Sequence, residues 1–384
     1  MLHRMAGVVC LVAWASAAGA QGRYYPDRFD WQRRSPAEAG MDAAALDAAV
    51  KFAIANENPA PRDLAVAHAT SLGAAEPFDT PIGPHKPRSA ANGLVIRHGR
   101  VVAEWGDTKA VDMTFSVTKT FLSTLVGLAW QKGLIRDVTD RARDYMPPGV
   151  DLFEDPHNQA ITWEHLLRQT SDWKGTLWGK PDWADRPEGK PEEWANRTLH
   201  APGTHYKYND VRVNLLALAL MNVMREPLPR VLKSRIMDPI GASSTWRWHG
   251  YDNSWVLVDG LNMQSVSGGG HFGGGMFISA TDHARFGLLM LRNGQWGSRR
   301  LLSKDWIARA IQPSPMKSDY AYLWWLNTGR KAIPAAPESA FWAAGFGGHY
   351  IYIDREHDLV VVLRWTPDLP GVVTRVLEAI EQRG

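Results

Sequence analysis

The chain has 384 residues, of which 45% are hydrophobic and 22% are charged. This composition is ordinary for a folded globular protein, and the length allows one large domain or two of ordinary size. The formal net charge is only +3, and no run of Lys and Arg alternates with aromatic residues, so the sequence gives no support to nucleic-acid binding.

The N-terminus has the pattern of a secretory signal peptide. Two basic residues precede an apolar run over 5–14, and small residues over 15–20 end in an Ala-x-Ala site. This order predicts a signal peptide over 1–20, cleavage after Ala20 and export, with the bacterial periplasm as the expected location. The apolar run is too short to span a bilayer, so we expect no membrane span in the mature chain. Cys10 is the single cysteine, so the mature chain is predicted to lack disulfides, thiolate metal sites and Cys nucleophiles.

The first predicted elements of the mature chain are a helix, a loop and a hairpin. Residues 42–53 are rich in Ala and place apolar side chains at helical spacing, which predicts a helix. Residues 57–90 contain many Pro, Gly and small residues and are predicted to form a long surface loop. Two β-rich runs, 93–97 and 100–105, flank His98-Gly99 and predict a β-hairpin.

The middle of the chain is predicted to be mostly helical. A strong helix is expected over 115–134, because Leu122, Leu125 and Val126 share one face and Gly133 marks its end. Residues 140–270 are expected to be helical and rich in loops. The helices predicted there are 163–169, 211–224 and 229–237.

The C-terminal third returns to strands. A glycine-rich stretch over 268–275 precedes a helix predicted over 281–292, which Ser279 and Asp282 open. Apolar runs over 349–354 and 359–365 predict two strands, and a closing helix is expected over 371–381.

This order of elements predicts an α+β (α/β) fold. Strands near both ends of the chain indicate one antiparallel β-sheet formed by both termini and flanked by helices. The helical stretch would then be a subdomain inserted over roughly 135–270. We therefore expect residues 21–384 to form one domain with two lobes and a cleft between them.

Several common catalytic motifs are missing from the sequence. No Gly-x-Ser-x-Gly occurs, which argues against a nucleophile elbow. No pair of His residues has the spacing of His-Glu-x-x-His, and the glycine-rich run at 268–275 does not follow a strand and open a helix as a phosphate loop does. We therefore expect no metal and no organic cofactor.

A Ser-x-x-Lys pattern points to nucleophilic catalysis. It occurs at 116–119, 171–174 and 314–317, and only the first opens a strongly predicted helix. Residues three apart share a helix face, so the Lys119 amine can reach the Ser116 hydroxyl. A helix N-terminus offers N–H groups where an oxyanion would form, and this potential together with burial is expected to lower the pKa of Lys119. The alternative is that Ser116 is a helix cap and Lys119 a surface charge.

The segment around Ser116 resembles a known family. Thr114-Phe-Ser-Val-Thr-Lys-Thr-Phe121 is similar to the nucleophile segment of the β-lactamase-related serine hydrolases. This family includes class C β-lactamases, DD-peptidases, family VIII esterases and 6-aminohexanoate-dimer hydrolases. The resemblance is strongest to the 6-aminohexanoate-dimer hydrolases, and it covers roughly residues 35–380.

The resemblance implies a catalytic tyrosine. The family's Tyr-x-Asn motif follows Pro-Gly-Thr and precedes an apolar helix, a context that here surrounds Tyr208-Asn-Asp210. Tyr208 would then work with Lys119 to relay the Ser116 proton to the leaving group. Asp210 stands where the family has Asn, and it would hold Lys119 charged or orient it. A strict Tyr-x-Asn begins at Tyr251, but it lacks that context.

The third family motif is incomplete. The family places Lys-Thr-Gly or His-x-Gly on a strand that lines the cleft, and Ala343-Ala344-Gly345 occupies that place without a cation. Asn327-Thr-Gly329 is similar, but it lies too far from the strand that follows. Gly345 still permits close backbone approach, and the Phe346 N–H would be the second oxyanion donor beside that of Ser116. Because the missing cation holds a substrate carboxylate in the relatives, the resemblance favours an esterase or amidase over a β-lactamase.

Two further stretches are similar to family segments. Residues 268–279 resemble a glycine-rich cleft segment, and 166–171 resemble a Leu-Leu-x-His-Thr-Ser loop in which Gln169 replaces His. The glycines could instead serve tight packing, and the many tryptophans could simply cover loops. Candidate substrate-binding residues are Trp178, Trp183, His271, Phe272 and Trp342.

Together these patterns predict an exported serine hydrolase. It would cleave a small-molecule ester or amide through an acyl-enzyme on Ser116, with Lys119 and Tyr208 as the acid/base pair. The alternatives are a β-lactamase, a DD-peptidase, or a non-catalytic penicillin-binding-like sensor or scaffold. The sequence does not predict the oligomeric state.

Overall fold

A six-stranded antiparallel sheet joins the two ends of the chain. The computed structural model describes residues 23–71, 74 and 76–381, so the predicted signal peptide and Cys10 lie outside the described residues. The strand order is β11-β12-β13-β14-β1-β2, and β1 pairs with β14 so that Val95 lies opposite Val361. The predicted sheet built from both ends is therefore confirmed. Its strands are β11 (Trp325–Leu326), β12 (Phe341–Gly345), β13 (His349–Asp354), β14 (Leu359–Arg364), β1 (Asn92–Arg97) and β2 (Arg100–Trp105).

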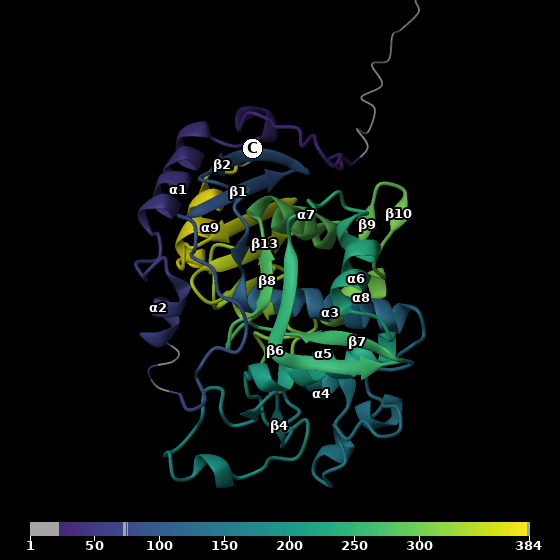
Figure 1. Ribbon diagram of the computed structural model, residues 1–384. Helices are drawn as coiled ribbons and strands as arrows, with labels where there is room; N and C mark the ends of the chain where they lie inside the picture. Colours follow the sequence, from purple (N-terminus) through teal and green to yellow (C-terminus); the bar gives the residue numbers. More distant parts are fainter. Residues whose placement is uncertain (1–22, 72–73, 75, 382–384) are drawn as a thin grey trace, which may run out of the picture.

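Helices cover both faces of this sheet, which is why β1 and β14 are buried along their whole length. Helices α1 (Ala43–Ala55) and α9 (Leu369–Glu378) lie side by side on one face (Figure 1). Because side chains alternate along a strand, Val361 joins the core under α1 and α9, whereas Val360 and Val362 join the core on the other face. Helix α7 (Ala280–Leu291) packs on that second face, and its N-cap Ser279 confirms the predicted start.

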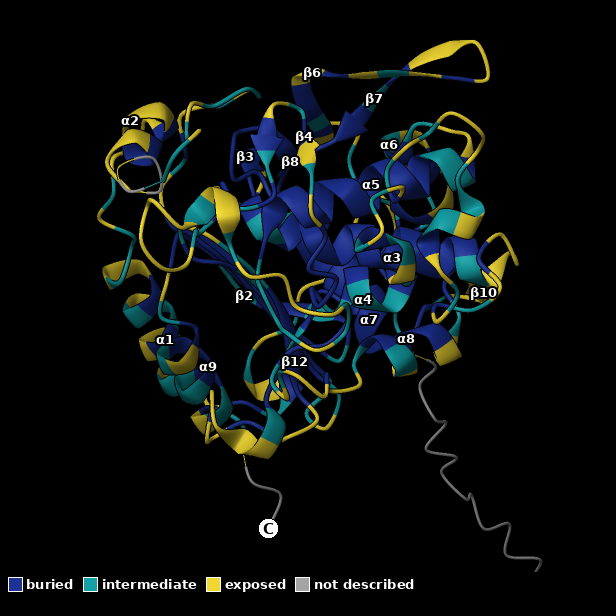
Figure 2. Ribbon diagram, turned by 90° about the horizontal axis from the view of Figure 1, so that it is seen from below, coloured by how far each residue is buried: buried dark blue, intermediate teal, exposed yellow. Residues whose placement is uncertain are grey.

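Away from this sheet, two buried helices, α3 (Thr118–Gln131) and α5 (Asp210–Met224), contact each other. Figure 2 shows both as largely buried ribbons in the middle of the molecule. Around them lie the shorter helices α4 (Trp163–Leu167), α6 (Leu228–Leu232) and α8 (Lys304–Ala310). The predicted helices over 163–169 and 211–224 are confirmed; the one over 229–237 is split between α6 and a π-helical turn, Lys233–Met237.

Two regions differ from the prediction. The segment over 57–90 holds a helix, α2 (Leu64–Ala69), whose N-cap Asp63 accepts from the N–H groups of Ala65 and Val66. The region over 140–270 holds a long hairpin, β6 (Arg247–Val258) and β7 (Leu261–Val266), that extends from the body (Figure 2). Asp259-Gly260 makes its turn with positive φ at both residues, so the short-range signal for this hairpin was in the sequence.

The remaining strands are short. A four-stranded sheet has the order β3-β8-β6-β7, with β3 (Asp112–Met113) and β8 (Gly275–Ile278) leading into α3 and α7. Two small hairpins are β4 (Thr176–Leu177) with β5 (Lys180–Pro181), and β9 (Gln295–Trp296) with β10 (Arg299–Arg300). Over the described ranges, no helix is long and apolar enough to cross a bilayer.

Candidate active site

A buried chain of polar groups begins at Ser116. The Lys119 Nζ lies 2.8 Å from the Ser116 Oγ and 2.6 Å from the Asp210 Oδ1. The side chains of Lys119 and Asp210 are each 1% exposed. The structure therefore brings Ser116 and Lys119 together as the spacing predicts. It also places Asp210, the residue that the resemblance expects to hold Lys119 charged or orient it, against Lys119 from a helix 91 residues away in the sequence.

The Asp210 carboxylate reverses the expected direction of the pKa shift of Lys119. Burial by itself would lower the pKa of Lys119, but the Asp210 carboxylate outweighs it and raises the pKa above its usual value. Burial would likewise raise the pKa of Asp210, but the charges of Lys119, Arg186 and His271 hold it well below the usual range. Lys119 and Asp210 therefore form a charged pair, and the predicted lowering of the Lys119 pKa is wrong.

The two tyrosines that match the motif have different surroundings. The Tyr208 ring lies beside the pair, with the Lys119 Nζ 4.7 Å from its centroid. Tyr251 is 1% exposed and its hydroxyl accepts hydrogen bonds from Asn214 and Ser267 in the core under α5. Tyr208 is therefore the tyrosine that the fold brings to Lys119.

The N-terminus of α5 fixes Tyr208 and Asp210. Asn209 caps the helix, its side chain accepting from the Arg212 N–H, and its own N–H donates to the Gln169 Oε1 at 2.6 Å. The Asn209 Nδ2 donates to the Asp182 carbonyl at 2.6 Å. Gln169, which replaces the family's His, thus holds the backbone between the two site residues.

Ser116 sits in a tight turn just before α3. The predicted helix over 115–134 is a 3₁₀ turn, Phe115–Val117, followed by α3, so Ser116 precedes the α-helix. Phe115 has a φ of 48°, a left-handed conformation that costs energy for a residue with a side chain. Its ring is held by His349, Trp365 and Phe346, whose ring centroids lie 5.4–6.3 Å away. No sequence pattern around Phe115 predicts this left-handed conformation.

The end of β12 packs directly against this turn. A Cβ built on Gly345 would lie 2.3 Å from the Thr114 carbonyl oxygen and 3.2 Å from the Val117 nitrogen, so no larger residue fits. Phe346 follows at the edge of the turn and is 40% exposed. The strand predicted to carry Ala343, Ala344 and Gly345 is thus confirmed as β12, and it brings no cation to Ser116.

Comparison with known protein families identifies the family of the chain. A sequence model of the β-lactamase family matches residues 86–375. The chain belongs to the β-lactamase family. Membership of this family indicates a hydrolase. No curated protein sequence matches the chain.

Solved structures of several hydrolases share the fold. A family VIII carboxylesterase is 18% identical, with a TM-score of 0.57 over 89% of this chain and 98% of that chain. A D-stereospecific amidohydrolase from Streptomyces sp. is 17% identical, with a TM-score of 0.54 over 87% and 98%. A β-lactamase from Mycobacterium bovis is 20% identical, with a TM-score of 0.54 over 76% and 95%. At such identities the likeness concerns the fold alone, so the kinship with 6-aminohexanoate-dimer hydrolases stays a prediction.

The glycine-rich stretch of this β-lactamase-family chain covers the buried pair. A Cβ built on Gly269 would lie 2.1 Å from both the Lys119 Nζ and the Asp210 Oδ2. The backbone N–H of His271 donates to the same Asp210 oxygen at 3.2 Å. The Nε2 of the His271 ring lies 2.5 Å from the Glu76 Oε2. His271 is therefore a buried partner of Asp210 rather than an exposed substrate contact.

Glu76, Asp185 and His271 also have a spacing that a metal ion could bridge. One ligand atom from each lies within 4.8 Å of the others. The Asp185 oxygens already accept from the Arg186 side chain and from the Asp210 N–H. The three residues therefore belong to a hydrogen-bonded network of charged groups. The Arg186 guanidinium, whose side chain is 35% exposed, is the cation of this network that lies nearest the solvent.

Arg186 is a site residue that the sequence analysis missed. Its Nη1 bonds to Asp185 and lies 4.0 Å from the Asp210 Oδ1. Its guanidinium carbon lies 5.1 Å from the centroid of the Tyr208 ring. A lone Arg in a loop carries no motif, so only its contacts identify it.

Two predicted substrate contacts lie elsewhere. Phe272 is fully buried, and the Lys180 Nζ covers its ring at 4.6 Å. Trp342 is 7% exposed and packs in the core under α1 and α9, because alternation along β12 turns it away from the face that carries Ala343. Neither side chain lines the Ser116 site, so both predictions are corrected.

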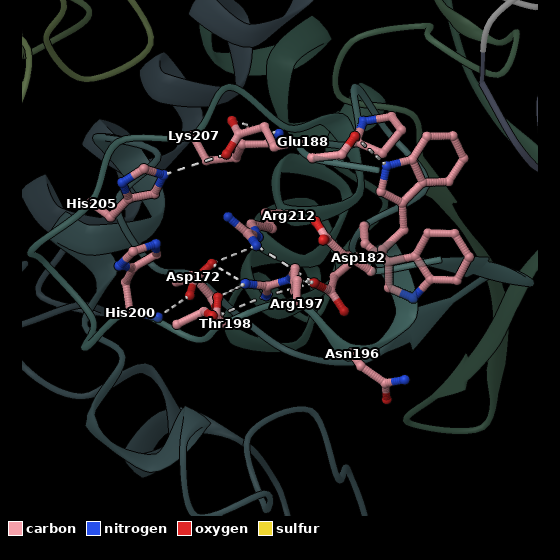
Figure 3. A pocket seen from close by; sticks show the side chains of 15 residues that line it. Asp172, Asp182, Glu188, Asn196, Arg197, Thr198, His200, His205, Lys207 and Arg212 are labelled. Carbon is pink, nitrogen blue, oxygen red and sulfur yellow. Dashed lines mark hydrogen bonds and ion pairs between the residues drawn. The ribbon is translucent and has the colours of Figure 1, made fainter. Parts of the chain in front are cut away.

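A separate polar cavity lies beside the segment that carries Tyr208, and Figure 3 shows the charged and polar side chains that line it. Its volume is about 480 Å³, and Trp183 is one of the lining residues. His205 and Lys207 line it, whereas the Tyr206 and Tyr208 rings pack on Tyr320 at 5.3 and 6.1 Å. Side chains of this extended segment thus alternate between cavity and active site. The cavity floor is an ion-pair network of Asp172, Asp182, Arg197 and Arg212.

Trp178, the last candidate, lies in the β4–β5 turn. It has a φ of 56°, and its carbonyl accepts from the Asn253 Nδ2 at 3.0 Å. Its ring is half-buried against the core. Its predicted role in substrate binding stays a prediction.

Proposed function

We propose that this chain is a serine hydrolase that cleaves an ester or amide bond through an acyl-enzyme on Ser116. The observation that carries the proposal is the buried chain from the Ser116 Oγ through the Lys119 Nζ to Asp210, with Tyr208 beside it. A surface cap and a surface lysine would need no buried counter-ion, because an exposed ammonium is solvated by water.

The reaction begins with attack of the Ser116 Oγ on the substrate carbonyl carbon. In the reactive form Tyr208 is a phenolate, and the Ser116 proton passes to its oxygen as the new C–O bond forms, leaving Tyr208 as the neutral phenol. The carbonyl oxygen becomes an oxyanion, which accepts hydrogen bonds from the N–H groups of Ser116 and Phe346. Collapse of this intermediate breaks the bond to the leaving group, which takes the proton from Tyr208. Water then attacks the acyl-enzyme by the same route and releases the acid.

Lys119 acts in this scheme as a cation rather than as the base. Because Asp210 keeps Lys119 protonated, its ammonium donates to the Ser116 Oγ and cannot accept the Ser116 proton. The same ammonium stabilises negative charge on the neighbouring Tyr208 oxygen. Asp210 in place of the family's Asn therefore moves the role of base onto Tyr208.

Two departures from the family motif favour an esterase or amidase over a β-lactamase or DD-peptidase. No cation stands at Ala343, and Lys119 is locked in an ion pair. The second departure also favours a rival proposal. A penicillin-binding-like sensor could form the acyl-enzyme and fail to hydrolyse it, because deacylation needs a base for water.

Intact mass after treatment with a fluorophosphonate probe tests the nucleophile. We expect one adduct on the wild type, no adduct on Ser116→Ala and weaker labelling of Lys119→Ala. Ser314→Ala is the matched control, since Ser314 belongs to another Ser-x-x-Lys and is bridged to Lys317 in a turn. An unlabelled wild type, or equal labelling of Ser116→Ala, contradicts the proposal.

Turnover of simple esters and of nitrocefin then separates the rivals. Ester hydrolysis that Ser116→Ala abolishes supports the hydrolase, and labelling without turnover supports the sensor. Nitrocefin turnover faster than ester turnover would support a β-lactamase. We also propose export with cleavage after Ala20, which the N-terminal sequence of the protein from a periplasmic extract tests.

A further inference from the structure

We propose that Arg186 binds a carboxylate of the substrate, so that the preferred ester or amide carries an acidic group. This inference depends on the proposed function of Ser116 and names the class of substrate for that site. It concerns Arg186, which lies between the family-like segments 166–171 and 208–210 and belongs to neither.

One edge of the Arg186 guanidinium is anchored. Its Nη1 bonds to the Asp185 carboxylate, which is fully buried, and it lies 4.0 Å from the Asp210 Oδ1. The guanidinium carbon lies 5.1 Å from the centroid of the Tyr208 ring. A planar cation held on one edge by a carboxylate and beside an aromatic ring has a fixed orientation.

The opposite edge of the guanidinium is free. Among the described residues, the Arg186 Nε and Nη2 have no hydrogen-bond partner, and the side chain is 35% exposed. The Lys119 and Asp210 side chains next to it are only 1% exposed. The Nε–Nη2 edge offers two parallel N–H groups, the geometry that binds a carboxylate through two hydrogen bonds.

The backbone fixes this edge relative to Tyr208. Arg186 has a φ of 50°, in the left-handed region, and its carbonyl accepts from the Lys207 Nζ. Asp185, its neighbour, accepts from the Asp210 N–H. The loop is thus tied on both sides to the segment that carries Tyr208, so the guanidinium is preorganised beside the proposed base.

The selectivity expected here comes from directed N–H groups rather than from net charge. Asp185 and Asp210 already balance the charges of Arg186 and Lys119, so the site does not attract every anion. A carboxylate gains most because it accepts both N–H groups in one plane, and a neutral ester group in the same place accepts more weakly. β12 supplies no competing cation, since Ala343, Ala344 and Gly345 are uncharged.

Two pairs of esters that differ in one carboxylate test the inference on both sides of the scissile bond. Mono-4-nitrophenyl glutarate and 4-nitrophenyl butyrate differ in the acyl group. 4-Acetoxybenzoate and methyl 4-acetoxybenzoate differ in the leaving group. We expect the wild type to have a higher kcat/KM for the acidic member of at least one pair, with most of the difference in KM.

The ratio of kcat/KM between acidic and neutral members is the readout, because a general loss of active protein cancels from it. In Arg186→Gln this ratio falls about 10- to 100-fold, as expected for the loss of charge-assisted hydrogen bonds to a substrate. Arg186→Lys keeps the charge without the planar fork and gives an intermediate ratio. Arg225→Gln is the matched control, because Arg225 also has a positive φ, 56°, and also pairs with an aspartate, Asp259, but both side chains are exposed. Arg225→Gln should leave the ratio unchanged.

The outcomes separate this inference from the proposed function. A wild type without preference for either acidic ester overturns the assignment of Arg186, and so does an equal change of the ratio in Arg186→Gln and Arg225→Gln. If Arg186→Gln does not fold because Asp185 is left unpaired, the double variant Asp185→Asn/Arg186→Gln removes both charges and must show the same fall. If Ser116→Ala still hydrolyses the esters, the proposed function itself fails, and this inference with it.

Discussion

Replacing Asp210 by Asn removes the carboxylate that neutralises the buried Lys119. The two charged groups lie 2.6 Å apart and their side chains are each 1% exposed. Removing one partner of a buried pair costs about 3–5 kcal/mol, because the remaining charge is left in the interior without compensation. We expect the free energy of unfolding of Asp210→Asn to be lower than that of the wild type by this amount wherever Lys119 stays protonated.

The loss should depend on pH in a defined direction. In the wild type, the pKa of Lys119 is raised and that of Asp210 is lowered, so the contribution of the pair is constant between about pH 5 and pH 9. In Asp210→Asn, burial is no longer opposed and lowers the pKa of Lys119 below its unfolded value. The unfolded variant then binds more protons than the folded one, so the stability of the variant rises with pH.

Urea denaturation followed by tryptophan fluorescence from pH 5 to pH 9 measures both effects. The destabilisation should be largest at pH 5 and shrink toward pH 9, and Lys119→Met/Asp210→Asn should recover most of it. Asp259→Asn, which breaks an exposed pair with Arg225, is the control and should cause no measurable loss. A destabilisation of Asp210→Asn below about 1 kcal/mol at pH 5, or one independent of pH, would refute the assignment of a buried charged pair.

Three further predictions concern neighbours of this pair. Tyr208→Phe should lower kcat for a simple ester about 100-fold or more. Tyr251→Phe should mainly lower the unfolding free energy, by about 1–3 kcal/mol. Similar kcat values for the two variants would contradict the choice of Tyr208 as the catalytic tyrosine. Gly269→Ala should abolish ester hydrolysis, since its Cβ would lie 2.1 Å from Lys119 and Asp210, and wild-type kcat would disprove this close approach. Burial opposes protonation of His271, but Asp185 and Glu76 outweigh it and raise its pKa. The stability that this His contributes is therefore complete below about pH 6.5 and declines as pH rises through the raised value, so the difference in unfolding free energy between wild type and His271→Gln should shrink at alkaline pH.

Local pattern was sufficient for most of the elements. The spacing of apolar residues located α1 and α3, capping residues located the start of α7, and apolar runs located β13 and β14, because each of these signals depends on residues close together in the chain. The long hairpin β6–β7 was missed although Asp259-Gly260 signals its turn. The helix α2 was missed because Pro and Gly dominate the loop around its six residues.

For the candidate site too, local sequence predicted some of the contacts and the fold alone produced the others. The sequence by itself determined that Ser116 and Lys119 lie one turn apart, because three-residue spacing on a helical turn leaves little freedom. The family motif pointed to Tyr208 and Asp210, but only the tertiary structure placed both against Lys119 and set Arg186 over the Tyr208 ring. It also decided that Phe272 and Trp342 are turned into the core. These contacts join residues tens to hundreds of positions apart, and they depend on how helices and strands pack, which no spacing within one segment specifies.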